Sequence, residues 1–257
     1  MYVVTHKECN VKLKNPYIFL QVGAALHPLL GYLADNVGDN ISQKNENFCE
    51  LTGLYWIWKN SEADVIGLVH YRRFFYTGRM NALMHRMMNI AHIKRYMRNY
   101  DLIVPKKTRY SKTIRAIYSE KHHAEDWQHV RGIICELYPE YLETFDKVAE
   151  SKELYVCNMF CGRKGLLDAY CKWLFGILFR MERSSDISNY DSYNRRIYGF
   201  LAERLFTVWI LKNRIRCKEI LIYNTEEGSM LQQTLIQPLL KKIKSILKGH
   251  SSDCERN

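Results

Sequence analysis

Short apolar runs alternate along the chain with longer segments in which apolar residues recur at helical spacing. The short runs predict strands and the longer segments predict helices. The predicted strands are Tyr2–His6, Val65–His70, Leu102–Pro105, Leu154–Phe160 and Lys218–Tyr223, and the predicted helices are Phe48–Lys59, Ala124–Leu137, Gly165–Arg183 and Arg196–Leu211. This alternation is typical of an α/β fold, in which helices cover a sheet.

Two further segments depart from this rhythm. Residues 35–47 are rich in Asp, Asn, Gly and Ser, which predicts an ordered loop. Met80–Met97 mixes methionines with basic residues at helical spacing, which predicts a solvated helix with a methionine-rich inner face, although such a face also suits lipid or an adaptable partner.

After Gly228 the composition changes. At helical spacing, an apolar stripe lies on the side opposite to four lysines. This pattern is typical of a basic amphipathic helix. The stripe consists of Leu239, Leu240, Ile243, Ile246 and Leu247, and the lysines are Lys241, Lys242, Lys244 and Lys248. Such a helix lies on an anionic membrane surface or packs on its own domain; we favour the membrane, through residues 238–249. The predicted division is therefore one domain, 1–225, and a basic amphipathic tail, 226–257.

Composition narrows the class of protein. A chain of 257 residues with 47% hydrophobic residues can bury one sizeable core. The net charge of +11 favours polyanionic partners. The sequence shows neither a signal-peptide pattern nor an apolar run long enough to cross a bilayer, so we expect a cytoplasmic protein, peripheral on the inner face of the cell membrane. Its eight cysteines contain no CxxC pair, and we expect free thiols.

The strongest candidate for a binding site follows the predicted strand Val65–His70. That strand leads directly into His70, Arg72 and Arg73. Ligands bind at the carboxyl ends of strands in open α/β sheets, and paired guanidinium groups match the oxygens of a diphosphate. The pattern predicts a diphosphate site, with His70 as an additional donor. The alternative is a pair of solvated or salt-bridged arginines at a strand end.

The polar loop supplies a second candidate. Asx and Ser side chains near a helix start suit a sugar, a ribose or a base edge, although turn formation and capping would explain the same residues. The loop candidates are Asp39, Asn40, Ile41, Ser42 and Asn45, with Glu50 opening the next helix.

Carboxylates and amides in apolar surroundings form a third group. Glu203 and Arg204 lie within a strongly apolar helix pattern, so the pair is functional or forms an internal ion pair. Asp126 lies at a predicted helix start, where N-capping is its alternative role. Asn158 lies at the end of an apolar run and could hold a sugar hydroxyl.

Several site motifs are missing from the sequence. There is no GxGxxG, P-loop, HExxH or GxSxG motif, and no Asp-x-Asp pair of the kind that holds a divalent cation in many nucleotide-sugar enzymes. No His and Cys residues have zinc spacing. We therefore expect no bound metal and no other cofactor.

Taken together, several segments resemble the DUF4422 family of glycosyltransferases, which is found in capsular and exopolysaccharide gene clusters. The similar segments are Thr5–Lys7, Gln21–Ala25, Asp39–Ser42, Lys44–Asn45, Cys49–Thr52, Leu54–Asn60, Gly67–Arg73, Asn158–Phe160 and Gly199–Phe206. The resemblance extends over about residues 1–225. It implies a single GT-A-like (Rossmann-like) nucleotide-sugar-binding domain.

The resemblance also implies an activity. It implies transfer of a hexosyl unit, galactosyl or galactofuranosyl, from a UDP-sugar donor to a polyprenyl-diphosphate-linked oligosaccharide acceptor. We predict that the arginines replace a metal and that Glu203, or else Asp126, deprotonates the acceptor, with His70 as a third catalytic candidate. The predicted donor-binding residues are Thr5, His6, Gln21, Val22, Gly23, Asp39, Asn40, Ile41, Ser42, Asn45, Arg72, Arg73, Asn158 and Arg204.

Two other classes of protein compete with this interpretation. The basic charge and the 18 tyrosines would suit a nucleic-acid-binding protein, but no such motif is present and many aromatic residues follow helical core patterns, so we expect no nucleic-acid partner. A non-catalytic scaffold that binds a nucleotide sugar within the polysaccharide machinery remains the alternative, because a fold can persist after activity is lost.

Overall fold

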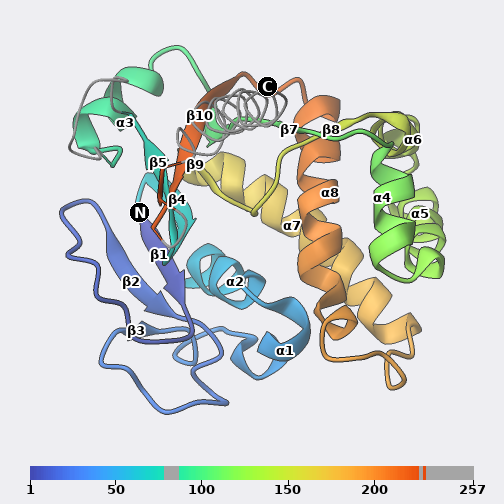
Figure 1. The fold of residues 1–257 in the computed structure, drawn as a ribbon, viewed down its shortest axis with the longest axis horizontal. Coiled ribbons are helices and arrows are strands. Elements are labelled where there is room, and N and C mark those ends of the chain that lie inside the picture. The colour runs from blue at the N-terminus through green and yellow to red at the C-terminus, as the bar shows by residue number, and fades with distance from the viewer. Residues whose placement is uncertain (78–86, 226–227, 230–257) are drawn as a thin grey trace, which may run out of the picture.

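The computed structural model describes residues 1–77, 87–225 and 228–229, and within them it contains a nine-stranded mixed sheet (Figure 1). Its main path follows the order β11-β10-β6-β9-β4-β1-β2-β3, and β5 pairs with β10 and β4. The strands are β1 (Tyr2–Thr5), β2 (Ile18–Gln21), β3 (Leu33–Ala34), β4 (Val65–His70), β5 (Arg73–Tyr76), β6 (Leu102–Pro105), β9 (Phe160–Arg163), β10 (Cys217–Asn224) and β11 (Gly228–Ser229).

The direction of the chain reverses beside β1. From β1 the chain moves outward to β2 and β3, which are parallel to it, and β4 then returns to pair in parallel with the other edge of β1. β9 lies antiparallel between β4 and β6. The sheet therefore has a topological switch point between β1 and β4, and ligands bind in the crevice outside the carboxyl ends of such strands.

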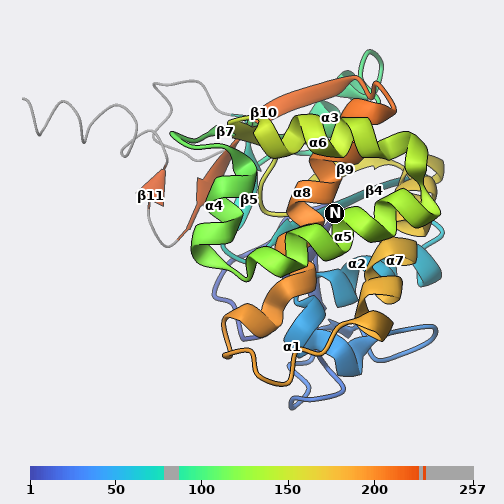
Figure 2. The same cartoon turned by 90° about the vertical axis from the view of Figure 1, so that its right-hand side faces the viewer.

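Helices cover the two faces of the sheet unequally, as Figures 1 and 2 show. The larger apolar core lies between the sheet and α2, α7, α8 and α4–α6, whereas α3 and the segment around Tyr17 cover the other face. The helices are α1 (Asn45–Phe48), α2 (Leu51–Asn60), α3 (Ile90–Tyr96), α4 (Ile114–Lys121), α5 (Ala124–Leu137), α6 (Leu142–Glu150), α7 (Lys164–Ser184) and α8 (Ile197–Lys212). Three 3₁₀ turns (Ser42–Lys44, Pro139–Tyr141 and Asn194–Arg196) and a two-stranded sheet of β7 (Thr108–Arg109) and β8 (Glu153–Leu154) complete the described residues.

The strongest sequence patterns are confirmed. The predicted strands at β4 and β6 and the predicted helix at α5 have the observed bounds; the prediction at β1 differs by one residue at one end, and those at β10, α7 and α8 differ by one residue at each end. α8 is buried almost all round, because it packs between α6, α7 and α1. The α/β class is therefore confirmed.

Two predicted elements are wrong in their extent. The predicted strand Leu154–Phe160 is broken, because Cys157 and Asn158 form a turn with φ of 75° and 47° before β9 begins. The predicted helix Phe48–Lys59 is divided into α1 and α2 at Cys49, where φ is 52°. A residue with this backbone conformation cannot continue a strand or a right-handed helix.

Several elements have no counterpart in the sequence prediction. They are β2, β3, β5, α4, α6 and the small sheet, whose short patterns are weak at the sequence level. For the predicted helix Met80–Met97, residues 78–86 lie outside the described residues and α3 covers Ile90–Tyr96. The predicted tail helix within 226–257 also lies outside them, and so does the proposed membrane contact at 238–249.

Candidate functional site

A cavity of about 840 Å³ lies at the switch point of the sheet. Thr5 ends β1 and His6 follows it, while His70 ends β4 and leads into Tyr71 and Arg72; all five residues line the cavity. The volume is within the range of small-molecule sites. Both the position and the size of the cavity therefore suit a ligand.

Arg72 and Arg73 line the wall formed by the β4–β5 hairpin. His70 pairs with Arg73 across this hairpin, and the N–H of Thr225, after β10, donates to the carbonyl of Arg72 at 2.9 Å. The Arg72 guanidinium lies 5.7 Å from the centroid of the Tyr71 ring. The backbone of both arginines is therefore anchored in the sheet, as precise placement of a pair of guanidinium groups requires.

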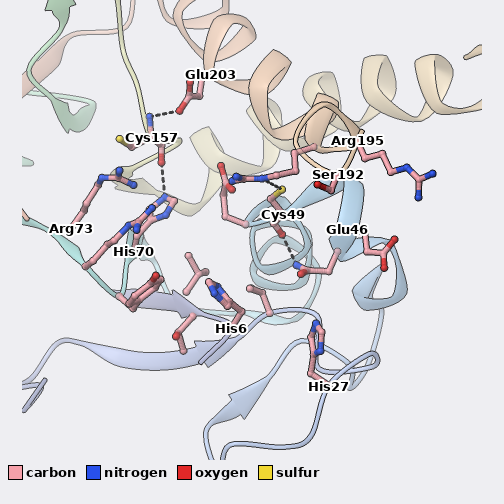
Figure 3. A pocket seen from close by; sticks show the side chains of 18 of the residues that line it. His6, His27, Glu46, Cys49, His70, Arg73, Cys157, Ser192, Arg195 and Glu203 are labelled. Atoms are coloured by element: carbon pink, nitrogen blue, oxygen red, sulfur yellow. Dashed lines mark hydrogen bonds between the residues drawn. The ribbon is translucent and has the colours of Figure 1, made fainter. Parts of the chain in front are cut away.

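His70 lies between this wall and the turn at Cys157 (Figure 3). Its Nε2 lies 2.6 Å from the carbonyl oxygen of Cys157, and because a carbonyl only accepts, Nε2 carries the proton. Burial lowers the pKa of His70, while the negative charge of Glu50 opposes this shift. The Arg72 and Arg73 charges lower it further, so the imidazole is neutral near pH 7.

Glu203 also lies beside the Cys157 turn, on α8 (Figure 3). Its Oε1 accepts from the N–H of Cys157 at 2.8 Å, and its Oε2 lies 3.1 Å from Nη1 of Arg204. Burial raises the pKa of Glu203, and the ion pair with Arg204 opposes that shift. The internal ion pair that the sequence left open is therefore present.

The loop between β2 and α1 is held by Asp35. This fully buried carboxylate accepts from the N–H groups of Gly23 and Ala24 at 3.0 Å and from the hydroxyl of Ser42 at 2.5 Å. Nearby, the amide of Gln21 bonds the backbone of the 28–30 segment. These contacts shape the loop from inside, so Gln21, Gly23 and Ser42 do not line the cavity.

The predicted residues divide into two sets. Those that line the cavity are Thr5, His6, Val22, Asn45, His70, Arg72, Arg73 and Glu203. Those that the structure places outside its lining are Gln21, Gly23, Asp39, Asn40, Ile41, Ser42, Asp126, Asn158 and Arg204. The strand ends thus converge as expected, whereas most of the polar loop does not reach the cavity.

Asp126 supports the cavity from behind. Its Oδ1 accepts from the hydroxyl of Tyr190 at 2.7 Å, its Oδ2 lies 3.4 Å from the hydroxyl of Tyr118, and its exposed fraction is 5%. Tyr190 itself lines the cavity. Asp126 therefore fixes a lining residue rather than facing the cavity.

Sequence reasoning missed an entire wall of the cavity. The connection between α7 and α8 contributes Tyr190, Ser192, Arg195 and Arg196, and the polar run 184–196 between two apolar helices was the signal available for it. The segment from the start of α1 to the start of α2 contributes further lining residues that are not among the predicted donor-binding or catalytic residues. These are Glu46, Cys49 and Glu50, with His27 opposite them (Figure 3).

Within residues 1–77 and 87–225, no three His, Cys, Asp or Glu side chains are grouped as potential metal ligands. No helix in the same part of the chain combines the length and apolar character needed to cross a bilayer.

The fold and the cavity together define an α/β protein with a basic ligand cavity at the switch point of its sheet. The chain belongs to the DUF4422 family: the model of this family, described as a domain of unknown function, matches residues 1–214. The resemblance inferred from the sequence motifs is thereby confirmed.

The chain is also similar to a solved structure whose protein has a described activity. The chain is similar to the apo structure of WbbM, a bifunctional glycosyltransferase, with 31% sequence identity and a TM-score of 0.79. The similarity covers 88% of this chain but 45% of that one, so the chain spans less than half the length of its neighbour. No curated protein matches the chain.

Proposed function

We propose that the protein is a glycosyltransferase with a GT-A-like domain, which transfers a hexosyl unit from a UDP-sugar. The observation that carries this proposal is the cavity at the carboxyl ends of β1 and β4, walled by Arg72 and Arg73, in a chain similar over most of its length to a bifunctional glycosyltransferase. A mixed sheet with its ligand crevice at the switch point is an arrangement suited to a nucleotide.

The charges around the cavity support a diphosphate donor. Arg72 and Arg73 offer planar forks of donors to the phosphate oxygens, and the neutral His70 adds a polar group beside them. As the bond between the anomeric carbon and the diphosphate breaks, negative charge grows on the leaving oxygen. Fixed guanidinium groups stabilise that charge in the transition state. We therefore expect turnover without added divalent cation.

The proposed acceptor is an oligosaccharide linked to polyprenyl diphosphate, in capsule, exopolysaccharide or O-antigen synthesis, and the proposed sugar is galactosyl or galactofuranosyl. The resemblance of the sequence motifs to glycosyltransferases of capsular and exopolysaccharide gene clusters supports this proposal, and the similarity to a bifunctional glycosyltransferase supports glycosyl transfer in general. The basic tail, residues 238–249, would hold the protein against the anionic inner face of the cell membrane, where a lipid-linked acceptor lies.

The first test is ligand-induced thermal stabilisation. The purified chain is heated with UDP, GDP, CDP or a panel of UDP-hexoses, with and without manganese. A ligand at 100 times its Kd stabilises the native state by about 2.7 kcal/mol, which corresponds to an increase in Tm of roughly 5–10 °C for a chain of this size. We expect UDP and one UDP-hexose to give this increase without manganese.

The same panel separates the competing functions. Stabilisation followed by release of UDP in the presence of acceptor supports the transferase. Stabilisation without transfer to any acceptor indicates the non-catalytic scaffold. If no nucleotide raises the Tm, the proposed donor site is wrong, and if chelator abolishes transfer, the metal-independent mechanism is wrong.

A further inference from the structure

Three carboxylates line the cavity, Glu46, Glu50 and Glu203, and the last two are held by different partners. Both oxygens of Glu203 are occupied, one by a backbone N–H and the other by the guanidinium of Arg204. Arg204 is itself 8% exposed, so the two charges neutralise each other within the protein. A carboxylate held in this way anchors α8 to the Cys157 turn and is poorly suited to accept a proton from a ligand.

Glu50 is held by one oxygen only. Its Oε1 accepts from Nδ2 of Asn158 at 2.7 Å, and the two residues are 108 positions apart in the chain. Among the described residues, no group donates a hydrogen bond to the second oxygen, Oε2. Glu50 therefore combines a fixed orientation with an oxygen that is available to a ligand.

The orientation of Asn158 follows from its surroundings. Its Nδ2 also lies 3.2 Å from the carbonyl oxygen of Gly199, so the amide nitrogen faces two acceptors. The opposite orientation of the amide would place Oδ1 against these two acceptor oxygens, which cannot donate to it. In the observed orientation Oδ1 is buried and has no hydrogen-bond partner within the part of the chain that the structure describes. A buried polar atom without a partner costs about 1–3 kcal/mol. The observed orientation of the amide carries this cost at Oδ1 and keeps Nδ2 of Asn158 as a donor to Glu50.

Backbone strain is concentrated around the same two residues. Cys49, which directs Glu50, has φ 52° and ψ −127°, and Cys157 and Asn158 have φ of 75° and 47°. Such conformations cost of order 1–3 kcal/mol for residues with a side chain, and they cluster at functional sites. Both strained segments contribute to this cavity, and the second also bonds His70 and Glu203 through the backbone of Cys157.

From this geometry, and resting on the proposed transferase activity, we propose that Glu50 is the general base of the reaction and that Asn158 is its positioning residue. The acceptor hydroxyl transfers its proton to Oε2 of Glu50. A lone pair of the acceptor oxygen forms the bond to the anomeric carbon. The bond from that carbon to the diphosphate oxygen breaks, and its electron pair leaves with UDP beside Arg72 and Arg73.

The test compares Glu50→Gln with Glu203→Gln in the full chain, with the exposed Glu140→Gln as control. The donor that stabilises the wild type is used for both binding and turnover. General-base catalysis contributes about 10²–10⁴-fold, so we expect Glu50→Gln to lower kcat by that factor and to leave donor-induced stabilisation unchanged. Glu203→Gln should lower the Tm and keep kcat within about tenfold of the wild type.

Asn158→Ala supplies a readout that a purely structural role would not change. Without the amide donor the Glu50 carboxylate loses its fixed orientation, so kcat should fall while the KM for the donor stays the same.

The outcomes distinguish the two proposals. A wild type that binds donor but never transfers it refutes the transferase and the role of Glu50 together. An active wild type in which Glu50→Gln retains its kcat, or in which Glu203→Gln instead lowers kcat by about 10²–10⁴-fold, refutes only the role of Glu50.

Discussion

At the scale of single residues, the cavity depends on a few charged side chains anchored by backbone contacts. Arg72 and Arg73 follow a buried strand, and their backbone pairs with β4 and β10. The sequence predicted these two residues because a strand end is a local pattern. It did not predict that Asp35, fully buried, would bind Gly23 and Ser42 and draw them away from the cavity lining.

We predict that Arg73→Ala weakens UDP binding by about tenfold to 100-fold, because a charge-assisted hydrogen bond contributes about 1.5–3 kcal/mol. Isothermal titration of the variant against the wild type measures the loss. Arg109→Ala is the matched control, since Arg109 is 79% exposed in β7, pairs with Glu153 and is not among the cavity-lining residues. An Arg73 variant that binds UDP as the wild type does would contradict the proposed diphosphate site.

At the scale of elements, close packing places the strand ends beside the helix starts. α2 crosses β1 and β2 at Gly53, where an added Cβ would lie 2.8 Å from Cγ1 of Val22 and 2.9 Å from Cγ1 of Val4. Both distances are shorter than ordinary van der Waals contact. Glycine at this position lets α2 approach the sheet, which brings Glu50 to the cavity.

We expect Gly53→Ala to destabilise the protein by about 1–3 kcal/mol, because overpacking outweighs the higher helix propensity of alanine. Gly132→Ala in α5 is the matched control, since nothing lies within 4 Å of its added Cβ, and it should stabilise by about 0.5–1 kcal/mol. Urea denaturation measures both changes. If both substitutions changed the free energy of unfolding by the same amount, the close packing of α2 on the sheet at Gly53 would not be required for stability.

The connection between α7 and α8 depends on the bond between Tyr190 and Asp126. Tyr190→Phe removes a donor from a buried carboxylate, so we predict a loss of about 1–3 kcal/mol in the free energy of unfolding, measured by chemical denaturation. Tyr193→Phe keeps its stacking on His122 and, at 49% exposure, should change stability by less than about 0.5 kcal/mol. Unchanged stability of Tyr190→Phe would contradict this role of the bond.

At the scale of the whole molecule, charge links the cavity to the proposed membrane location. The chain carries 38 Lys and Arg against 27 Asp and Glu, and the tail concentrates lysines opposite an apolar stripe. Each lysine near an anionic surface contributes about 1 kcal/mol. The basic charge therefore favours both a phosphorylated donor and an anionic membrane.

We predict that changing Lys241, Lys242, Lys244 and Lys248 together to Gln weakens binding to anionic vesicles by more than about tenfold. Sedimentation with vesicles at low and high salt measures this binding, and vesicles of neutral lipid are the control. Donor-induced thermal stabilisation should persist in the variant. Unchanged vesicle binding would favour a tail that packs on its own domain.

Local patterns were sufficient for part of this protein. Apolar runs and apolar periodicity determined β1, β4, β6, α5, α7 and α8, because each of these segments buries many apolar side chains. The sequence also determined the arginines at the end of β4 and the family. Short elements such as β2 and β5 lacked enough positions to show a period, and their pairing in the sheet was decided by the tertiary structure.

Only the tertiary structure decided which polar residues share the cavity. The Tyr190–Arg196 wall, Glu50 and the Asn158 amide come from segments far apart in the chain, and the hydrogen bond between Asn158 and Glu50 joins residues 108 positions apart. The left-handed turns at Cys49 and at Cys157–Asn158 leave no trace in periodicity, because they are imposed by the packing around them. Local sequence therefore determined where strands and helices form, and long-range packing decided which of their ends meet as a site.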